Sequence, residues 1–262
     1  MISWFAAVLL GAASPASLPT LPPQIYHSVT RPLCSSLKDR IEPALGMMIQ
    51  NDATIAKSVP YFQDYIKRST EGSDAGRDIA VLHMEDLVTP LVNSTLAVQK
   101  LLNDPSVFPP AARTPDDATL LKIKTQMLKV LAAQEASLDL INGFVSTEQL
   151  SQLQSEGMEY ITSLSASQSS GVASPLPVPT AMGYGQGFDD LALKAGLPPD
   201  PYQIDLTQIP GLAMGYNPIS SIKEGVVWTQ GESRKAADPL AKTVTAAAHA
   251  CGAPVVSPSP KP

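Results

Sequence analysis

The chain has 262 residues, of which 44% are hydrophobic and 16% charged, so it can bury one substantial core or two small ones and is too apolar to be wholly disordered. Its formal net charge of -6, with no basic cluster larger than a pair, argues against a nucleic-acid partner. The 25 prolines gather near the N-terminus, between Pro175 and Pro218, and in the tail. This distribution predicts that packed and irregular regions separate along the chain.

The N-terminal segment has the pattern of a secretory signal. Residues Ile2 to Ala13 form an apolar run that is too short to span a bilayer, and Ser14-Pro15-Ala16 then places small residues where a signal peptidase reads them. We therefore predict a signal peptide over 1–16, a Pro-rich leader over 17–32 and a secreted or periplasmic mature protein. The alternative is a buried N-terminal helix, because no lysine or arginine precedes the run. No other segment is apolar enough to predict a membrane span.

The two cysteines, Cys34 and Cys251, lie near opposite ends of the predicted folded region. Export places them in an oxidising compartment, which favours a disulfide between them over two separate thiols in apolar niches.

The first helical pattern lies in the fifty residues after the leader. Its seam advances by alternating steps of four and three through Ile41, Leu45, Met48, Asp52, Ile55, Val59, Phe62 and Ile66, which is the spacing of a coiled-coil seam. Pro43 is expected to kink this helix, and Ser58 before Pro60 is able to cap a fresh start. One bent helix and two collinear helices are both compatible with the pattern. Glu71-Gly72-Ser73 predicts a turn.

Two more helical patterns follow. The second runs from about Asp74 to Asn103, where Asp104-Pro105 ends it. The third begins with Thr114 as N-cap and Pro115 at the first helical position. Its two neighbouring apolar stripes predict contact with two partner helices. Gly143 is expected to end or loosen it, after which Ser146 and Gln149 form a capping box for a continuation to Leu164.

These patterns predict an all-α fold, an up-down-up helical bundle of long kinked helices over 33–164. Residues 165–232 are rich in Ser, Pro and Gly and are expected to wrap the bundle with short helices at Phe188 to Ala195 and from Asn217-Pro218 to Trp228. A final short helix over 233–252, beginning at Asp238-Pro239, is expected to pack back on the bundle. The tail, 253–262, is expected to be disordered.

Polar residues inside the apolar seams are the candidate ligand-binding residues. Asp52, Ser94 and Gln134 occupy seam positions, and buried polar groups need partners, so they either fix the helix register or line a wet cavity. His83 is the one histidine of three within a predicted core helix, and the predicted alignment puts it near Gln134. The candidate polar pocket is therefore His83, Asp52 and Gln134. The alternative places Asp52 on the surface and bonds Gln134 to backbone.

The chain carries no complete catalytic, metal-binding or cofactor-binding motif, so neither a metal nor a cofactor is expected. We expect an exported, non-enzymatic helical protein that acts as an extracytoplasmic interaction or envelope-associated module and has a protein partner. The alternative function is a carrier that holds a small apolar or metal-containing ligand between its helices, lined by Met48, Met84, Met127 and His83.

Overall fold

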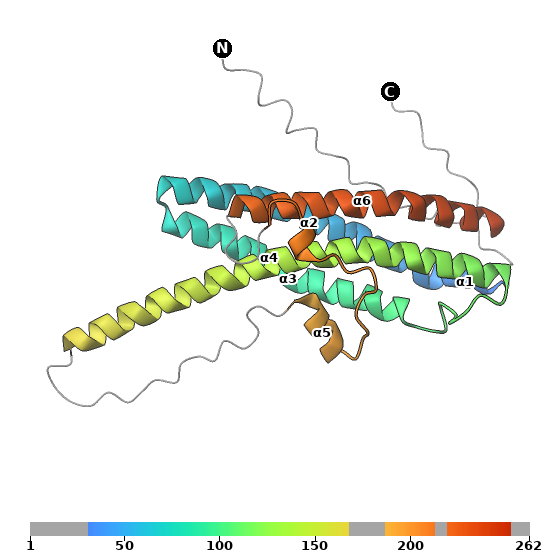
Figure 1. Ribbon diagram of the computed structural model, residues 1–262, viewed down its shortest axis with the longest axis horizontal. Helices are drawn as coiled ribbons and strands as arrows, with labels where there is room; N and C mark the ends of the chain where they lie inside the picture. The colour runs from blue at the N-terminus through green and yellow to red at the C-terminus, as the bar shows by residue number, and fades with distance from the viewer. Residues whose placement is uncertain (1–30, 168–186, 213–218, 253–262) are drawn as a thin grey trace, which may run out of the picture.

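The computed structural model describes residues 31–167, 187–212 and 219–252, and all regular elements in these ranges are helical (Figure 1). The prediction of an all-helical protein is confirmed for this part of the chain. The predicted signal peptide, the leader before Arg31, the linker over 168–186 and the tail after Gly252 lie outside the described residues.

The elements follow one another in a simple order. They are α1 (Pro32–Ser36), the π-helical turn η1 (Leu37–Ile41), α2 (Glu42–Glu71), α3 (Asp74–Leu102), α4 (Pro115–Ser167), α5 (Phe188–Lys194), the short 3-10 helix η2 (Leu206–Gln208) and α6 (Ile219–Ala250).

The predicted helix boundaries have the expected local causes. Gly72 ends α2 in the left-handed conformation, with φ of 70°, which glycine adopts without steric cost. At the start of α4, the Asp117 amide donates to Thr114 Oγ1, and Asp117 accepts from the Thr114 amide in return. Pro60 lies inside α2, so the segment is one helix, and Ser58 donates to the Ile55 carbonyl in place of capping a second helix.

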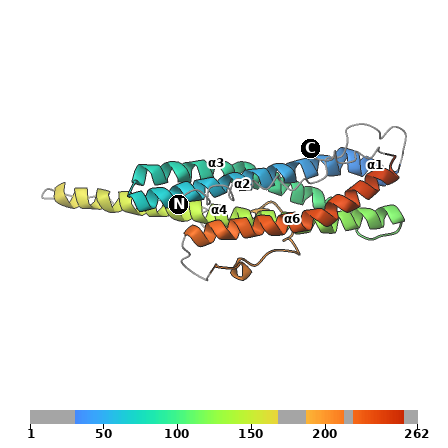
Figure 2. The same ribbon diagram turned by 90° about the horizontal axis from the view of Figure 1, so that it is seen from above.

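The four long helices pack in two layers, with α2 and α3 on one side and α4 and α6 on the other (Figure 2). Arg40 pairs with Asp104 just beyond α3, and Asn51 donates to Thr95, so α2 and α3 run in opposite directions. The helices α4 and α6 are antiparallel as well, because the Ser137 and Thr229 hydroxyls bond in mid-helix while the start of α4 lies beside the end of α6 (Figure 1).

The apolar core consists of two clusters at different levels of the bundle. The first cluster contains the disulfide and is built from α1, the first part of α2, the end of α3, the first half of α4 and the last half of α6. The second cluster lies further along and contains Ile55, Phe62, Met84, Leu138, Ile141, Phe188 and Val226. Phe188, Ala192 and Ile209 bring the 187–212 segment onto this second cluster.

The final helix is longer than the sequence analysis expected, because α6 spans 32 residues and Pro239 lies inside it. The expected short helix after residue 233 was therefore wrong. Gly225, within the helical signal that was expected to end at Trp228, is buried where α6 approaches α4, and a Cβ there would lie 3.1 Å from Leu140 Cδ1. Close packing thus compensates for the low helix propensity of this glycine.

Cys34 and Cys251 form a disulfide with their Cα atoms 5.6 Å apart, as the sequence analysis predicted. Arg31 reinforces the same end of the bundle. Its guanidinium donates to both carboxylate oxygens of Asp116 at the start of α4 and to the Ala250 carbonyl at the end of α6. The ends of three helices are therefore held together by covalent and ionic contacts.

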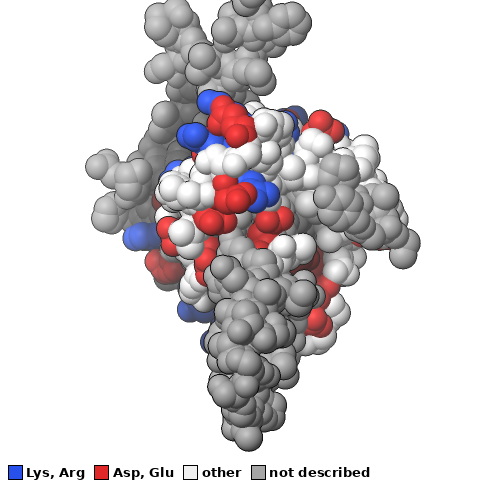
Figure 3. Space-filling model, turned by 90° about the vertical axis from the view of Figure 1, so that its left-hand side faces the viewer, with Lys and Arg blue, Asp and Glu red and all other residues white. Residues whose placement is uncertain are grey.

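The opposite end of the bundle, where α2 turns into α3, carries mixed charges (Figure 3). Lys67 and Arg68 pair with acidic residues of α2, and Arg77 pairs with Asp74 at the start of α3. Because these charges balance locally, this face offers no single-sign surface for a charged partner.

Candidate functional site

A layer of polar side chains crosses all four long helices between the two apolar clusters. It consists of Asn51 and Asp52 from α2, Ser94 and Thr95 from α3, Gln134 and Ser137 from α4, and Thr229 and Ser233 from α6. Each of these residues bonds to another member. We call these eight residues the polar layer.

The structure brings two of the three candidate pocket residues together in this layer. Gln134 Nε2 donates to Asp52 Oδ1 and to the Met48 carbonyl, both at 2.8 Å. Ser233 Oγ donates to the same carboxylate at 3.0 Å. Burial raises the pKa of Asp52, although the hydrogen bonds from Gln134 and Ser233 act in the opposite direction. The contacts satisfy Asp52 from within the bundle, which is the arrangement expected of residues that fix helix register.

His83 lies away from the polar layer. It is exposed on α3, and its ring centre lies 5.0 Å from that of Tyr61. The turn at Gly72 sets the α2–α3 register and puts His83 opposite Tyr61, several residues past the level of Asp52. The three methionines suggested as a ligand lining are completely buried within the apolar clusters, Met48 and Met127 in the first and Met84 in the second.

Replacing Gln134 by alanine is expected to lower the free energy of unfolding by about 2 to 3 kcal/mol, because two buried hydrogen bonds disappear and Asp52 keeps only Ser233 as a donor. Urea denaturation at neutral pH measures the change. Gln126→Ala is the matched control, since Gln126 is a half-buried glutamine of the same helix whose Oε1 has no hydrogen-bond partner. Equal losses for both variants would contradict a role for Gln134 in the layer.

A buried group of carboxyls is the feature that the sequence analysis missed. Glu135 of α4 interacts electrostatically with Asp139 of the same helix, Asp189 of α5 and Asp200 of the following loop, and Asp139 and Asp189 are half-buried. Glu135 is 4% exposed and Asp200 5% exposed. The α4 pattern had marked Gln134 as the buried polar position and gave no role to Glu135. Its burial depends on the 187–212 segment, which is distant in sequence.

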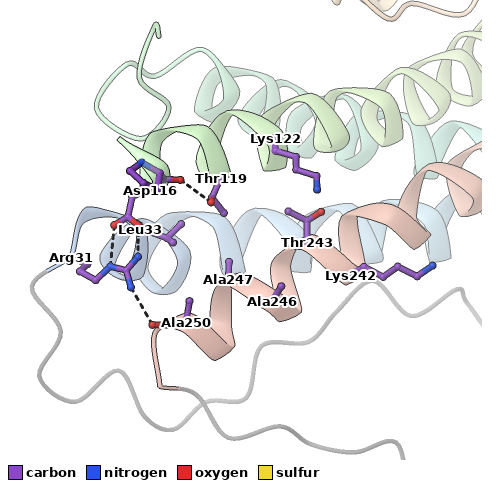
Figure 4. Close-up of a pocket in the computed structure, with 11 residues that line it drawn as sticks. Arg31, Leu33, Asp116, Thr119, Lys122, Lys242, Thr243, Ala246, Ala247 and Ala250 are labelled. Atoms are coloured by element: carbon purple, nitrogen blue, oxygen red, sulfur yellow. Dashed lines mark hydrogen bonds and ion pairs between the residues drawn. The ribbon is translucent and has the colours of Figure 1, made fainter. Parts of the chain in front are cut away.

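An open groove of about 390 Å³ lies at the disulfide end of the bundle, between the start of α4 and the end of α6 (Figure 4). Its floor is formed by small side chains, Ala246, Ala247 and Ala250, together with Leu33 of α1. Thr119 of α4 and Thr243 of α6 add hydroxyl groups. The groove is therefore shallow, with room for a main chain to approach the helices.

The lining of this groove carries a net positive charge, whereas the whole chain has a net charge of -6. Three basic residues line it, Arg31, Lys122 and Lys242, and only one acidic residue, Asp116. Arg31 pairs with Asp116, whereas neither lysine has an ion-pair partner among the described residues. Lys122 points toward Thr243 across the groove, and Lys242 extends along its rim (Figure 4). This arrangement leaves two uncompensated ammonium groups beside a small-residue floor.

The described residues contain no group of three or more His, Cys, Asp or Glu side chains placed to hold a metal ion. None of the helices in the same ranges is long and apolar enough to cross a lipid bilayer. In comparisons with known proteins, no family model, no curated protein and no solved structure matches the chain.

Proposed function

We propose that this protein is an exported, non-enzymatic interaction module that works outside the cytoplasm, in or near the cell envelope, and binds an acidic peptide segment of a protein partner. The groove between α4 and α6 is the proposed binding site. The observation that carries the proposal is the pair of unpaired lysines, Lys122 and Lys242, beside a small-residue floor in a chain of net charge -6. Peptide carboxylates provide the complementary charge.

The proposed site is preorganised, which reduces the entropy lost on binding. Its walls come from α1, α4 and α6, and the Cys34–Cys251 disulfide and the Arg31 contacts hold these helices together. The alanines of α6 let a peptide backbone lie close to the helix, where Thr119 and Thr243 offer hydroxyls. Two ammonium groups are too few to favour a nucleic-acid backbone, and their charge is complementary to that of a short acidic stretch.

Two features support the extracytoplasmic part of the proposal. The apolar run Ile2 to Ala13 followed by Ser14-Pro15-Ala16 has the order of a signal peptide. A disulfide persists in oxidising compartments and is rare in the cytosol. Mass measurement of the protein from its native compartment tests this part, and a mass that still includes residues 1–16 would contradict it.

Titration with a hexaglutamate peptide tests the site. At low ionic strength the full oxidised chain is expected to bind this probe saturably, and the double substitution K122E/K242E is expected to weaken binding at least about tenfold, because attraction becomes repulsion at two positions. Heteronuclear NMR measures the dissociation constant and locates the shifted resonances. Added salt is expected to weaken the complex, since exposed charges are screened.

The matched control is K57E/K100E, which makes the same charge change at two exposed lysines of α2 and α3 outside the groove. This control is expected to change the dissociation constant less than about threefold through net charge alone. A similar loss in both double variants, or no saturable binding by the unmodified chain, would overturn the proposal.

A further inference from the structure

Residues 187–212, which we call the docked segment, are attached to the bundle by two kinds of contact. Apolar side chains enter the second cluster, with Phe188 2% exposed and Ile209 1% exposed. Polar contacts accompany them: the Phe188 amide donates to Asp139 Oδ1 at 2.6 Å, and Gln99 of α3 donates to the Pro198 carbonyl at 3.0 Å. The docked segment therefore contacts α3 and α4, and Ile209 also lies against α6 at Gly225.

The interface beneath this segment brings several carboxyls into electrostatic interaction with one another. Asp200, Asp189 and Asp139 are the charged groups that act on Glu135, and Asp190 acts on Asp139 as well. No ion pair between described residues involves any of these carboxyls. Fixed negative charges in such a place would repel one another across the interface.

Lys194 of α5 is the cation within the docked segment, and it is already engaged in an interaction of its own. The other elements around the interface bring neutral groups or direct their charge elsewhere. From α3 comes the amide of Gln99, and α6 faces α4 through the hydroxyls of Thr229 and Ser233. Lys129 of α4 extends over the Tyr202 ring, 5.3 Å from its centre. One oxygen of Glu135 and one of Asp200 are buried with no hydrogen-bond donor among the described residues. The other oxygen of Asp200 accepts from the Tyr202 amide at 2.8 Å, which offsets part of the cost of burying its charge.

We propose that the docked segment is a pH-responsive strap, closed on α4 while the carboxyls of Glu135, Asp139 and Asp200 are protonated and loosened when they ionise. This inference rests on a different part of the molecule from the peptide groove and is independent of the proposed function.

The direction of the response follows from the pKa values. Burial, with the neighbouring aspartates, raises the pKa of Glu135 to about 9, and burial raises the pKa of Asp139 and of Asp200 to about 6. In the open segment these groups regain pKa values near 4. Closure is therefore fully favoured below about pH 4, weakens as the two aspartates ionise around pH 6, and weakens further toward pH 9.

Opening would uncover apolar surface. Phe188, Ala192 and Ile209 would leave the second cluster, and the parts of α4 and α6 that they cover, including Ile141 and Val226, would become accessible. Because the surrounding pH sets the protonation of these carboxyls, the strap couples pH to the exposure of a hydrophobic face.

Amide hydrogen exchange of the full oxidised chain between about pH 5 and pH 8 tests the strap, with each rate divided by the intrinsic rate at that pH. The opening equilibrium constant for peptides within 188–210 is expected to increase at least about tenfold over this range, since each pKa unit corresponds to a factor of ten. Peptides from the first half of α4, at 116–131, are expected to change less than about twofold.

The substitutions E135Q, D139N and D200N, made together, remove the ionisation and keep an oxygen acceptor for the Phe188 and Tyr202 amides. This variant is expected to lose the pH dependence and to stay closed at pH 8. D238N, at an exposed position of α6, is the control and keeps the dependence. Equal protection of 188–210 at both pH values in the unmodified chain, stronger protection at pH 8, or an undiminished pH dependence in the triple variant would each overturn the proposal.

Discussion

Replacing both half-cystines by alanine, C34A/C251A, is expected to lower the free energy of unfolding by about 5 kcal/mol. The bridge spans a sequence separation of 217, and the chain-entropy model gives about that value for so long a loop. Both residues are also buried in the first apolar cluster, so the packing around them is lost or loosened. Guanidinium denaturation of the oxidised protein and of the variant measures the difference.

Reduction of the unmodified chain provides an independent control for the disulfide, because it keeps both cysteine side chains and removes only the covalent bond. Reduced protein is expected to have a denaturation midpoint close to that of C34A/C251A. A loss of less than about 1 kcal/mol in both samples would mean that the bridge adds little to an already fixed bundle end.

Phe62→Ala is expected to lower the free energy of unfolding by about 3 to 5 kcal/mol. The ring is completely buried in the second apolar cluster, and its centre lies 5.3 Å from that of Phe144, which also stacks edge-on with Tyr65. Removing it leaves a cavity between α2 and α4 and breaks this aromatic group. Thermal and urea unfolding measure the loss.

Leu82→Ala is the matched control for this core prediction, because Leu82 of α3 is 57% exposed. It is expected to change the free energy of unfolding by less than about 0.5 kcal/mol. A small effect of Phe62→Ala, similar to that of Leu82→Ala, would show that α2 and α4 do not pack through this ring in solution.

Local signals in the sequence predicted most of the helices. The Gly72 turn, the Thr114 cap and the apolar spacing of α2, α3 and the first half of α4 each involve residues a few positions apart, so their effects are visible in the sequence. The extent of α6 was not predictable in this way. Asp238-Pro239 was expected to begin a new helix, whereas Pro239 lies inside α6, and the fit of Gly225 against Leu140 depends on a helix more than eighty residues earlier in the chain.

The sequence also indicated two residues of the polar layer, because their positions can be recognised within single helices. Asp52 and Gln134 both interrupt apolar seams, and the structure joins them. His83 required the relative register of two helices, and this depends on the geometry of the Gly72 turn, so its expected neighbours differ from the observed Tyr61. The carboxyl group around Glu135 depends on where the 187–212 segment docks, and no short-range pattern encodes that position.

The position of the disulfide determines how the bundle will fluctuate. The bridge and the Arg31 contacts fix α1, α4 and α6 at one end, whereas at the other end the described helices are linked by the Gly72 turn and by noncovalent contacts such as the Tyr65–Glu148 hydrogen bond. Spontaneous fraying will therefore start at the end away from the disulfide and advance toward it. The hydrogen bonds of the polar layer, which lie between the two ends, will oppose its advance. The groove lies at the cross-linked end of the bundle, so its shape will persist while the other end fluctuates.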